Sequence, residues 1–448
     1  TKYYYDPAQQ GGAQYGNLTK VEEYTGGALY RETRNYYYPN AASSTYVVDR
    51  LAETQVWDGA GAVWAKTRYY YDGATSVSTP PVRGNLTRVD RAQQVNPDLW
   101  TTVQTTTYDS AYYYLPTQVT DGNGNPTTTT YDSTWKMYPV RVTNAKGQAT
   151  NYTYNYIYGK VATVTSPNGS STRVTYSYDV HGRLTMIHKP GDTTQCTVMY
   201  TYCNNCSPFR TTTFERAVVN EPAAVPSVRY YNGLGQLIQE HHATIETTRT
   251  RITNYTYNAQ GQRQYAYVPY TIDTPGYAQW EQYVTLDTSQ PKTTYTYDAL
   301  GRITTVTNPD GTKVRTAYQG LKRAVLDENN RQHIYESDAF GRLTSVKEFV
   351  GSFASVNWSA DPYATTLYQY NPLDLLTGVT DHAGHQTTIG YDALGRKTSI
   401  DDPDMGAWAY TYDNDGNLIS QTDAQNQKTC FCYDELNRLT RKDYVNAG

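Results

Sequence analysis

The chain has 448 residues, a formal net charge of -4 and 18% charged residues. This balance excludes the basic surface that binding to a nucleic-acid backbone requires, so we expect no nucleic-acid partner. No stretch approaches the roughly 18 consecutive apolar residues of a membrane-spanning helix, so the sequence predicts no transmembrane segment.

Tyrosine dominates the aromatic residues, with 48 Tyr against 6 Phe and 7 Trp. Tyr joins a large apolar ring to a hydroxyl that stays hydrated, and both Tyr and Thr favour strands. The composition therefore predicts extensive β-sheet with at least one wet face.

The first part of the chain, residues 1–150, carries the looser copies of a repeat, with Gly-Asn-Leu-Thr at 16–19 and again at 84–87. The chain begins at Thr1 without an initiator Met or a signal peptide, and residues 444–448 end inside a strand-like run. We therefore expect a piece of a longer protein.

Residues 151–448 carry more regular copies. Tyr followed by Asp or Asn recurs at positions 370, 391, 412 and 433, in steps of 21 residues. The same pair recurs at positions 131, 154 and 178, in steps of 23 and 24. We predict a single repeat array over residues 1–448, with insertions near 217–228, 268–292 and 347–366.

One copy, residues 293–312, explains the period. Thr and Tyr alternate up to Tyr297, as in a strand. Residues 298–301 read as a turn, because Asp bonds nearby backbone and Gly supplies a positive φ. Residues 302–307 form the return strand and 308–311 the next turn.

The period predicts an all-β fold of repetitive antiparallel hairpins, about 21–24 residues per repeat. The hairpins should join into a long continuous sheet. Because open sheets of more than about ten strands curl or split, we expect this sheet to spiral into a shell or solenoid.

The best preserved turns are the predicted structural sites of the chain, and the hexapeptide YDALGR stands unchanged at 297–302 and 391–396. The predicted turn residues are Tyr178, Asp179, Gly182, Arg183, Tyr297, Asp298, Gly301, Arg302, Tyr391, Asp392, Gly395, Arg396, Tyr412, Asp413 and Gly416.

The signature Tyr-Asp-x-x-Gly-Arg-Leu/Ile-Thr resembles the YD repeat of the RHS-repeat family. That family includes RHS polymorphic toxins, the BC component of Tc toxins, wall-associated proteins and teneurins. The resemblance implies a β-strip spiralling into a hollow shell, which in the toxins encloses a cytotoxic C-terminal segment. The toxins' self-cleaving terminus has no counterpart after Asp402-Pro403-Asp404, so no protease residue is carried over.

Other candidate sites have simpler explanations. Cys203-Asn204-Asn205-Cys206 places its cysteines at the Asp and Gly positions of the repeat turn, which favours a turn disulfide or free thiols over a metal site. The loops at 121–125 and 413–417 resemble calcium loops, but position six is Pro126 or Leu418 where Gly is needed. Residues 401–404 read as a solvated turn.

The histidines His181, His241 and His242 have no nucleophile or metal ligand at motif spacing. We predict no catalytic, cofactor-binding or metal-binding residue, and no cofactor.

The sequence thus predicts a non-enzymatic, extracellular or cell-surface structural scaffold, either extended like a filament or part of a hollow shell. One alternative is an encapsulation and delivery shell for a C-terminal toxin that this chain does not contain. Another is a glycan-binding adhesin, because tyrosine rings stack on sugars. The predicted partners are other copies or neighbouring segments of the same polypeptide, an enclosed toxin or a surface glycan. An enzyme is the least favoured class.

Overall fold

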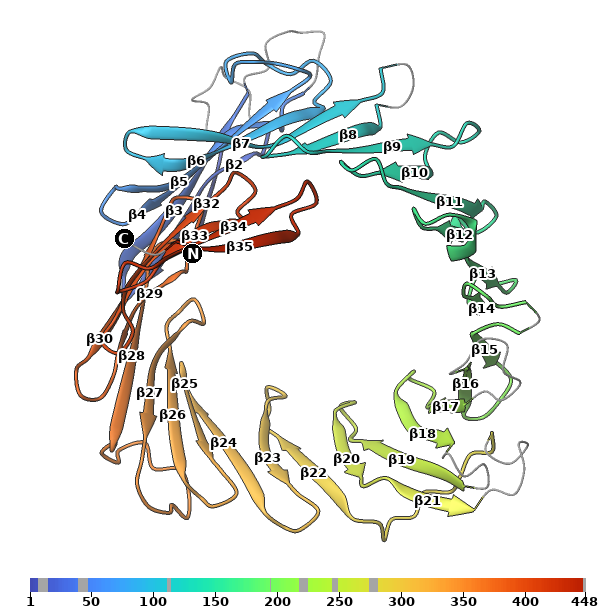
Figure 1. The fold of residues 1–448 in the computed structure, drawn as a ribbon. Coiled ribbons are helices and arrows are strands. Elements are labelled where there is room, and N and C mark those ends of the chain that lie inside the picture. The colour runs from blue at the N-terminus through green and yellow to red at the C-terminus, as the bar shows by residue number, and fades with distance from the viewer. Residues whose placement is uncertain are drawn as a thin grey trace. The chain divides into compact units, whose positions relative to one another are not determined.

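The structure, a computed structural model, describes residues 1–6, 15–38, 47–110, 114–193, 195–216, 225–243, 249–273 and 281–445 (Figure 1). The chain divides into two compact units. The first unit comprises residues 1–149, 335–347 and 363–448. The second comprises residues 150–334 and 348–362. Each unit is described by itself below.

The first unit is built from strands at the two ends of the chain. They are β1 (Lys2–Tyr5), β2 (Leu18–Thr25), β3 (Ala28–Tyr37), β4 (Leu51–Asp58), β5 (Val63–Tyr71), β6 (Leu86–Val95), β7 (Asp98–Tyr108), β8 (Pro116–Asp121), β9 (Pro126–Tyr131), β10 (Pro139–Thr143), β28 (Ala364–Tyr370), β29 (Leu376–Thr380), β30 (Gln386–Tyr391), β31 (Lys397–Asp402), β32 (Gly406–Tyr412), β33 (Leu418–Thr422), β34 (Lys428–Tyr433) and β35 (Leu439–Val445).

The second unit is built from the middle of the chain. Its strands are β12 (Lys160–Thr165), β13 (Val174–Tyr178), β14 (Leu184–His188), β15 (Val198–Cys203), β16 (Phe209–Glu215), β17 (Val225–Tyr231), β18 (Leu237–Ala243), β19 (Arg249–Tyr257), β20 (Arg263–Tyr267), β21 (Tyr270–Asp273), β22 (Lys292–Tyr297), β23 (Ile303–Thr307), β24 (Lys313–Gln319) and β25 (Lys322–Leu326). Residues of both units occur in β11 (Ala149–Asn155), β26 (Gln332–Ser337) and β27 (Leu343–Glu348).

Each strand pairs with its sequence neighbour in antiparallel orientation, from β1 through β10 and from β28 through β35 in the first unit. The described pairings of the second unit follow the same rule, except that β19 pairs with both β20 and β21, and β20 pairs with β22. The described residues contain no α-helix and one short 3-10 turn, η1 (Ser170–Thr172). The predicted all-β class of repeated antiparallel hairpins is therefore confirmed.

The register shifts at the motif tyrosine in every regular hairpin. In β22–β23 the shift falls between Thr296 and Tyr297, and in β30–β31 between Gly390 and Tyr391. The loop that follows is a three-residue connection with a left-handed last residue, which forms a bulge against the partner strand. Gly301 has φ 80° and Gly395 φ 81°, so a side chain at either position would strain the backbone.

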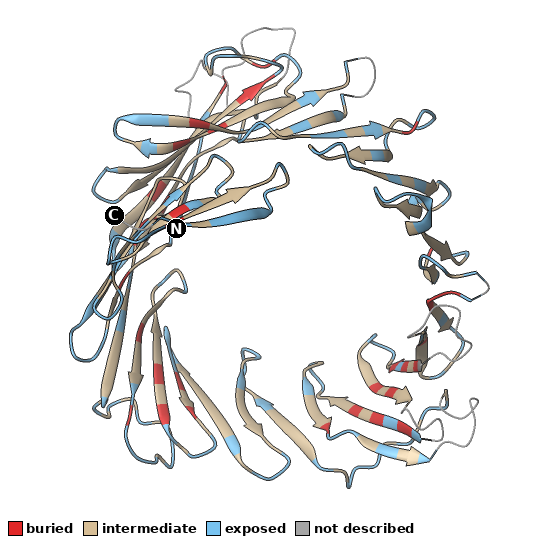
Figure 2. Cartoon of the chain, viewed as in Figure 1, coloured by how far each residue is buried: buried red, intermediate tan, exposed pale blue. Residues whose placement is uncertain are grey.

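The core is thin and local. Figure 2 shows buried residues scattered along the strands of each unit. In the second unit, Val228 and Tyr230 form one buried cluster. Ala324, Ile334 and Phe349 form another, covered by the predicted insertion through Phe353, Val356, Trp358 and Ala360.

Two buried glutamines in the second unit fix covering segments to the sheet. The Gln239 side chain donates to the Val284 carbonyl at 2.8 Å and accepts from its amide at 3.0 Å. The Gln332 side chain makes the same pair of bonds to Asn357, at 2.8 and 2.7 Å. Both glutamines are fully buried, so each insertion supplies the backbone groups that satisfy them.

The insertion predicted near 268–292 therefore includes a covering segment at 281–286, whereas residues 274–280 lie outside the described residues. Most of the insertion predicted near 217–228 also lies outside them, and β17 begins at Val225. That residues 1–448 form a single array stays a prediction.

Candidate functional site

The repeat turn is built around its aspartate. In the copy at 297–302, Asp298 Oδ1 accepts hydrogen bonds from the backbone amides of Leu300 and Arg302, both at 2.9 Å. Asp298 Oδ2 accepts from Arg302 Nε at 2.7 Å. The bond from the Arg302 amide lowers the pKa of Asp298, because it favours the charged carboxylate. One side chain thus closes the whole turn.

The same arrangement recurs at the other predicted turns. Asp179 bonds Arg183 and Asp392 bonds Arg396 through the same pairs of atoms, at 2.6 to 2.9 Å. In the variant turn at Asp413, Asn417 replaces the arginine and donates its amide to the carboxylate at 2.9 Å. The turn is therefore a structural element.

The motif tyrosine joins each repeat to the one before it. The Tyr391 hydroxyl donates to the Leu376 carbonyl at 2.8 Å, and the Tyr412 hydroxyl to the Lys397 carbonyl at 2.8 Å. Tyr178 and Tyr297 make the same kind of bond at 2.7 Å. Burial raises the pKa of all four hydroxyls, so they remain neutral donors at neutral pH.

The motif arginine stacks on the tyrosine of the following repeat. The Arg302 guanidinium lies 4.0 Å from the centroid of the Tyr318 ring, and Arg183 lies 4.2 Å from that of Tyr202. The sequence analysis did not predict either link between repeats, although an arginine 16 to 19 residues before a tyrosine was a usable signal. The repeat residues connect hairpin to hairpin.

The first unit brings turns from the last third of the chain against strands and turns of the first third. We call these contacts the turn seam. It begins at Asp374, whose carboxylate bridges Arg31 at 2.6 Å and Arg342 at 2.7 Å. Tyr30 donates its hydroxyl to the Asn371 carbonyl at 2.6 Å and accepts from Arg342 at 2.7 Å.

The seam continues in order along both segments. The Ala393 amide donates to the Gln93 carbonyl at 3.2 Å, and Thr101 donates to the Asn414 side chain at 3.1 Å. At the far end, Lys146 Nζ lies 3.2 Å from Asp434 Oδ2 and 3.1 Å from Glu435 Oε2. Later turns meet later strands, so the contacts form one continuous line within the first unit.

The two loops that resemble calcium loops meet at this seam. The Gly122 amide donates to Asp415 Oδ1 at 2.7 Å, and Asn123 donates to Asp413 Oδ2 at 2.9 Å. Burial, together with the neighbouring Asp121 carboxylate, raises the pKa of Asp415. In the described part of the chain, no three His, Cys, Asp or Glu side chains lie close enough to hold a metal ion.

The CxxC motif lies in the turn between β15 and β16. Cys203 and Cys206 form a disulfide with a Cα–Cα distance of 5.4 Å. Cys196, Cys430 and Cys432 are free thiols, and Cys196 is buried.

The structure also places the histidines and the acidic turn for which the sequence predicts no catalytic or metal-binding role. His241 is buried and bonds Gln239 at 2.7 Å. Asp402 accepts from the amides of Asp404 and Met405, at 3.0 and 3.1 Å, which closes the turn at 401–404. His181 is exposed. No helix among the described residues combines the length and the apolar character needed to cross a membrane.

Comparison with known proteins finds the repeat and the fold. The family described as RHS Repeat matches residues 158–194, 285–313, 370–404 and 408–447. No curated protein sequence matches the chain.

Among solved structures, the crystal structure of TcdB2-TccC3 superposes with a TM-score of 0.77 at 14% identity, covering 93% of this chain and 27% of that one. A crystal structure of TcdB2-TccC3 without the hypervariable C-terminal region gives 0.77 at 13% identity, covering 93% and 29%.

A Photorhabdus luminescens Tc holotoxin pore gives a TM-score of 0.75 at 12% identity, again covering 93% of this chain and 29% of the other. This chain thus spans less than a third of the chains that it resembles, and the likeness shows a shared fold. Four segments of the chain thus match the RHS Repeat family, at positions where the turn motif recurs along the sequence.

Proposed function

We propose that this chain is a non-enzymatic structural wall, secreted or at the cell surface, in which RHS hairpins form a closed surface. The turn seam is the observation that carries the proposal. Within the first unit, turns at 371–374, 392–396, 413–417 and 434–438 dock on strands and turns from the first 146 residues. A strip whose late repeats bind its early repeats favours a closed wall over an extended filament.

The side-chain chemistry supports the same proposal. The motif aspartates bond their own turns, the tyrosine hydroxyls bond the preceding repeat and the arginines stack on the following one. A glycan-binding row of tyrosines would need free hydroxyls and open ring faces. Because the repeat tyrosines use these groups within the array, no second class of function is proposed.

A closed wall has an enclosed side, and the occupant that fits the resemblance is a polypeptide segment of the same protein beyond this chain. The likeness to the structure of TcdB2-TccC3 without its hypervariable C-terminal region supports this form of the proposal. Fusing a reporter peptide after residue 448 of the parent gene product, and measuring its protection from protease, tests it. Reporter cleavage as fast in the folded protein as in the unfolded one would contradict enclosure.

Gly122 offers a direct test of the closed wall. A Cβ added there would lie 2.8 Å from the Asn414 carbonyl oxygen, so Gly122→Ala must push the seam apart. Gly233 occupies the same place in its own turn and has open space around it, so Gly233→Ala is the matched control.

Negative-stain images of the wild-type chain and the Gly233→Ala variant should show closed particles. The Gly122→Ala variant should show opened particles and faster hydrogen exchange at 413–417. Extended filaments in the wild type, or no change on Gly122→Ala, would overturn the proposal.

A further inference from the structure

The turn between β15 and β16 departs from the repeat design in one chemical respect. Its strands pair without the register shift of the motif hairpins, and Cys203 lies opposite Arg210. A disulfide stands where the other turns have an aspartate and its hydrogen bonds. The closed loop is short, so it stabilises the folded chain less than a long-range disulfide would.

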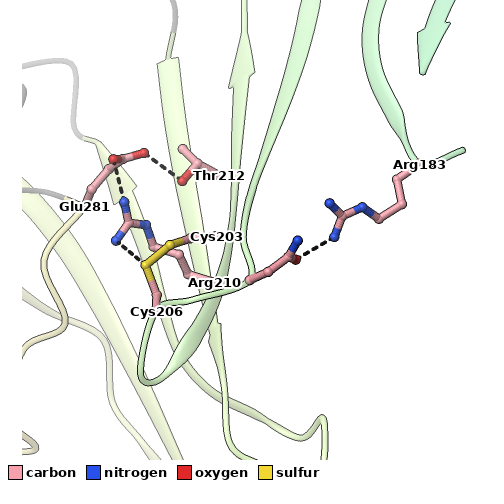
Figure 3. Close-up of a disulfide and its surroundings, with 7 residues drawn as sticks. Arg183, Cys203, Cys206, Arg210, Thr212 and Glu281 are labelled. Atoms are coloured by element: carbon pink, nitrogen blue, oxygen red, sulfur yellow. Dashed lines mark hydrogen bonds and ion pairs between the residues drawn. A yellow bond between two sulfur atoms is a disulfide. The ribbon is translucent and has the colours of Figure 1, made fainter. Parts of the chain in front are cut away.

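A cation is held against one sulfur of this disulfide (Figure 3). Arg210 Nη1 lies 3.4 Å from Cys206 Sγ, and Arg210 Nη2 donates to Glu281 Oε2 at 3.0 Å. The other carboxylate oxygen of Glu281 accepts from Thr212 at 2.9 Å. Glu281 thus fixes the position of the guanidinium, and the described contacts place no cation on the Cys203 sulfur.

This asymmetry decides how the disulfide can react. A neighbouring guanidinium stabilises a thiolate, and the sulfur that is more stable as a thiolate leaves faster in thiol–disulfide exchange. Arg210 therefore favours Cys206 as the leaving sulfur and Cys203 as the sulfur that is attacked. Asn204 and Asn205 between them are exposed, and both cysteines are half-buried, so the loop can be reached from solvent.

We propose that Cys203–Cys206 is an exchangeable redox centre whose substrate is a small thiol or a dithiol protein. The attacking thiolate forms a mixed disulfide with Cys203 Sγ, the Cys203–Cys206 bond breaks and its electron pair leaves on Cys206 Sγ, beside Arg210. A second thiolate then attacks the external sulfur of the mixed disulfide. The Cys203 thiolate leaves and takes a proton from water. Two thiols are oxidised to a disulfide and the protein disulfide is reduced.

Glutathione is the probe for this proposal. The folded chain is mixed with excess reduced glutathione, quenched with acid at intervals and analysed by peptide mass spectrometry. The early mixed disulfide should be found on Cys203. Mixed disulfide found mainly on Cys206, or divided equally between the two cysteines, would overturn the assignment of Arg210.

Two charge variants should change the rate in opposite directions. Arg210→Gln should slow reduction about threefold for each tenfold loss in the stability of the Cys206 thiolate. Glu281→Gln should accelerate it, because the guanidinium loses its competing carboxylate. Thr212→Val is the control, because it removes the hydrogen bond to the same Glu281 carboxylate without changing any charge. It should leave the rate of reduction within about twofold of wild type.

A pH profile separates this electrostatic role from loss of folding. In the Cys203→Ser variant, iodoacetamide alkylation of Cys206 should have a midpoint below about 8.5, and adding Arg210→Gln should return it toward that value. A midpoint that Arg210→Gln does not move would also overturn the proposal, even if the variant is less stable.

Discussion

The hexapeptide YDALGR occurs twice, once in each unit, and the two copies form the same turn. Asp298 and Asp392 each accept two backbone amides at 2.9 to 3.0 Å and one arginine Nε at 2.6 to 2.7 Å. Both tyrosine hydroxyls bond a carbonyl of the preceding repeat. Six residues are therefore sufficient to specify the turn.

The surroundings of the two copies differ. The Arg396 side chain is 18% exposed and its Nη1 donates to the Asp413 carbonyl at 2.7 Å, whereas the Arg302 side chain is 40% exposed. The Ala393 amide bonds Gln93 in the seam. Local sequence thus makes the hairpin, and contacts with other repeats give each copy its surroundings.

Removing the turn aspartate from each copy should give the largest difference between the local contribution to hairpin stability and the contribution of contacts with other repeats. Asp392→Ala should speed amide exchange in β30–β31 about 50-fold, and Asp298→Ala should speed exchange in β22–β23 about tenfold. The larger loss arises because Asp392 also positions Arg396 for its bond to Asp413. Hydrogen exchange read by mass spectrometry measures both. Equal effects would mean that the bond from Arg396 to Asp413 adds nothing to the stability of the turn.

Removing the two motif arginines should also speed amide exchange more in the 391–396 copy than in the 297–302 copy, but by a smaller factor than removing the aspartates. Arg396→Ala removes a carbonyl bond as well as a stack on Tyr412, so exchange in β30–β31 should rise about tenfold. Arg302→Ala removes the stack on Tyr318 and should raise exchange in β22–β23 about threefold. Arg396→Lys is the control, since it keeps the charge but cannot bond Asp392 and Asp413 together. A lysine variant indistinguishable from wild type would contradict the bonding role.

The hairpins could be predicted from sequence because their interactions are short-range. The alternation before Tyr297, and the Asp and Gly of its turn, act within a few residues. The contact between Gln93 and Ala393 joins residues 300 positions apart, and nothing in either local pattern marks it. The buried side chains of Gln239 and Gln332 could not be predicted either, because a lone Gln in a polar strand usually lies on a wet face.

The loops at 121–125 and 413–417 illustrate the same limit. Each forms a turn between two strands, yet their meeting at the seam depends on the fold of the whole first unit. Even so, both sequences carry an unusual density of Asp, Asn and Gly. That density was the only signal for a contact between turns.

The Asp121–Asp415 contact predicts a pH dependence of the seam. Because the folded-state pKa of Asp415 is raised by burial and then by Asp121, its stabilising contribution is fully present below about pH 4 and is lost as the pH rises through the raised value. Asp415→Asn should therefore raise the melting temperature at pH 7 by about 2 °C and leave it unchanged near pH 4.

Asp381 is the matched control, because its pKa is shifted in the opposite direction to that of Asp415. The His385 side chain lowers the pKa of Asp381, so the stability that this aspartate provides is present at neutral pH and is lost as the pH falls below about 4. Asp381→Asn should slightly lower the melting temperature at pH 7 and have no effect in acid. Thermal unfolding followed by circular dichroism measures both variants, and parallel shifts would contradict the assignment.

The leucines of the two hexapeptides give the smallest expected effect and the sharpest negative control. Leu300 is 78% exposed, whereas the equivalent Leu394 is half-buried. Leu300→Ala should leave exchange in β22–β23 unchanged within about twofold, since exposed side chains contribute little apolar burial. Leu394→Ala should speed exchange in β30–β31 by about threefold, because part of its side chain is removed from water by the first unit. If both substitutions were silent, the seam around this turn would rest on polar contacts alone. If Leu300→Ala had the larger effect, the environments assigned to the two copies would be wrong.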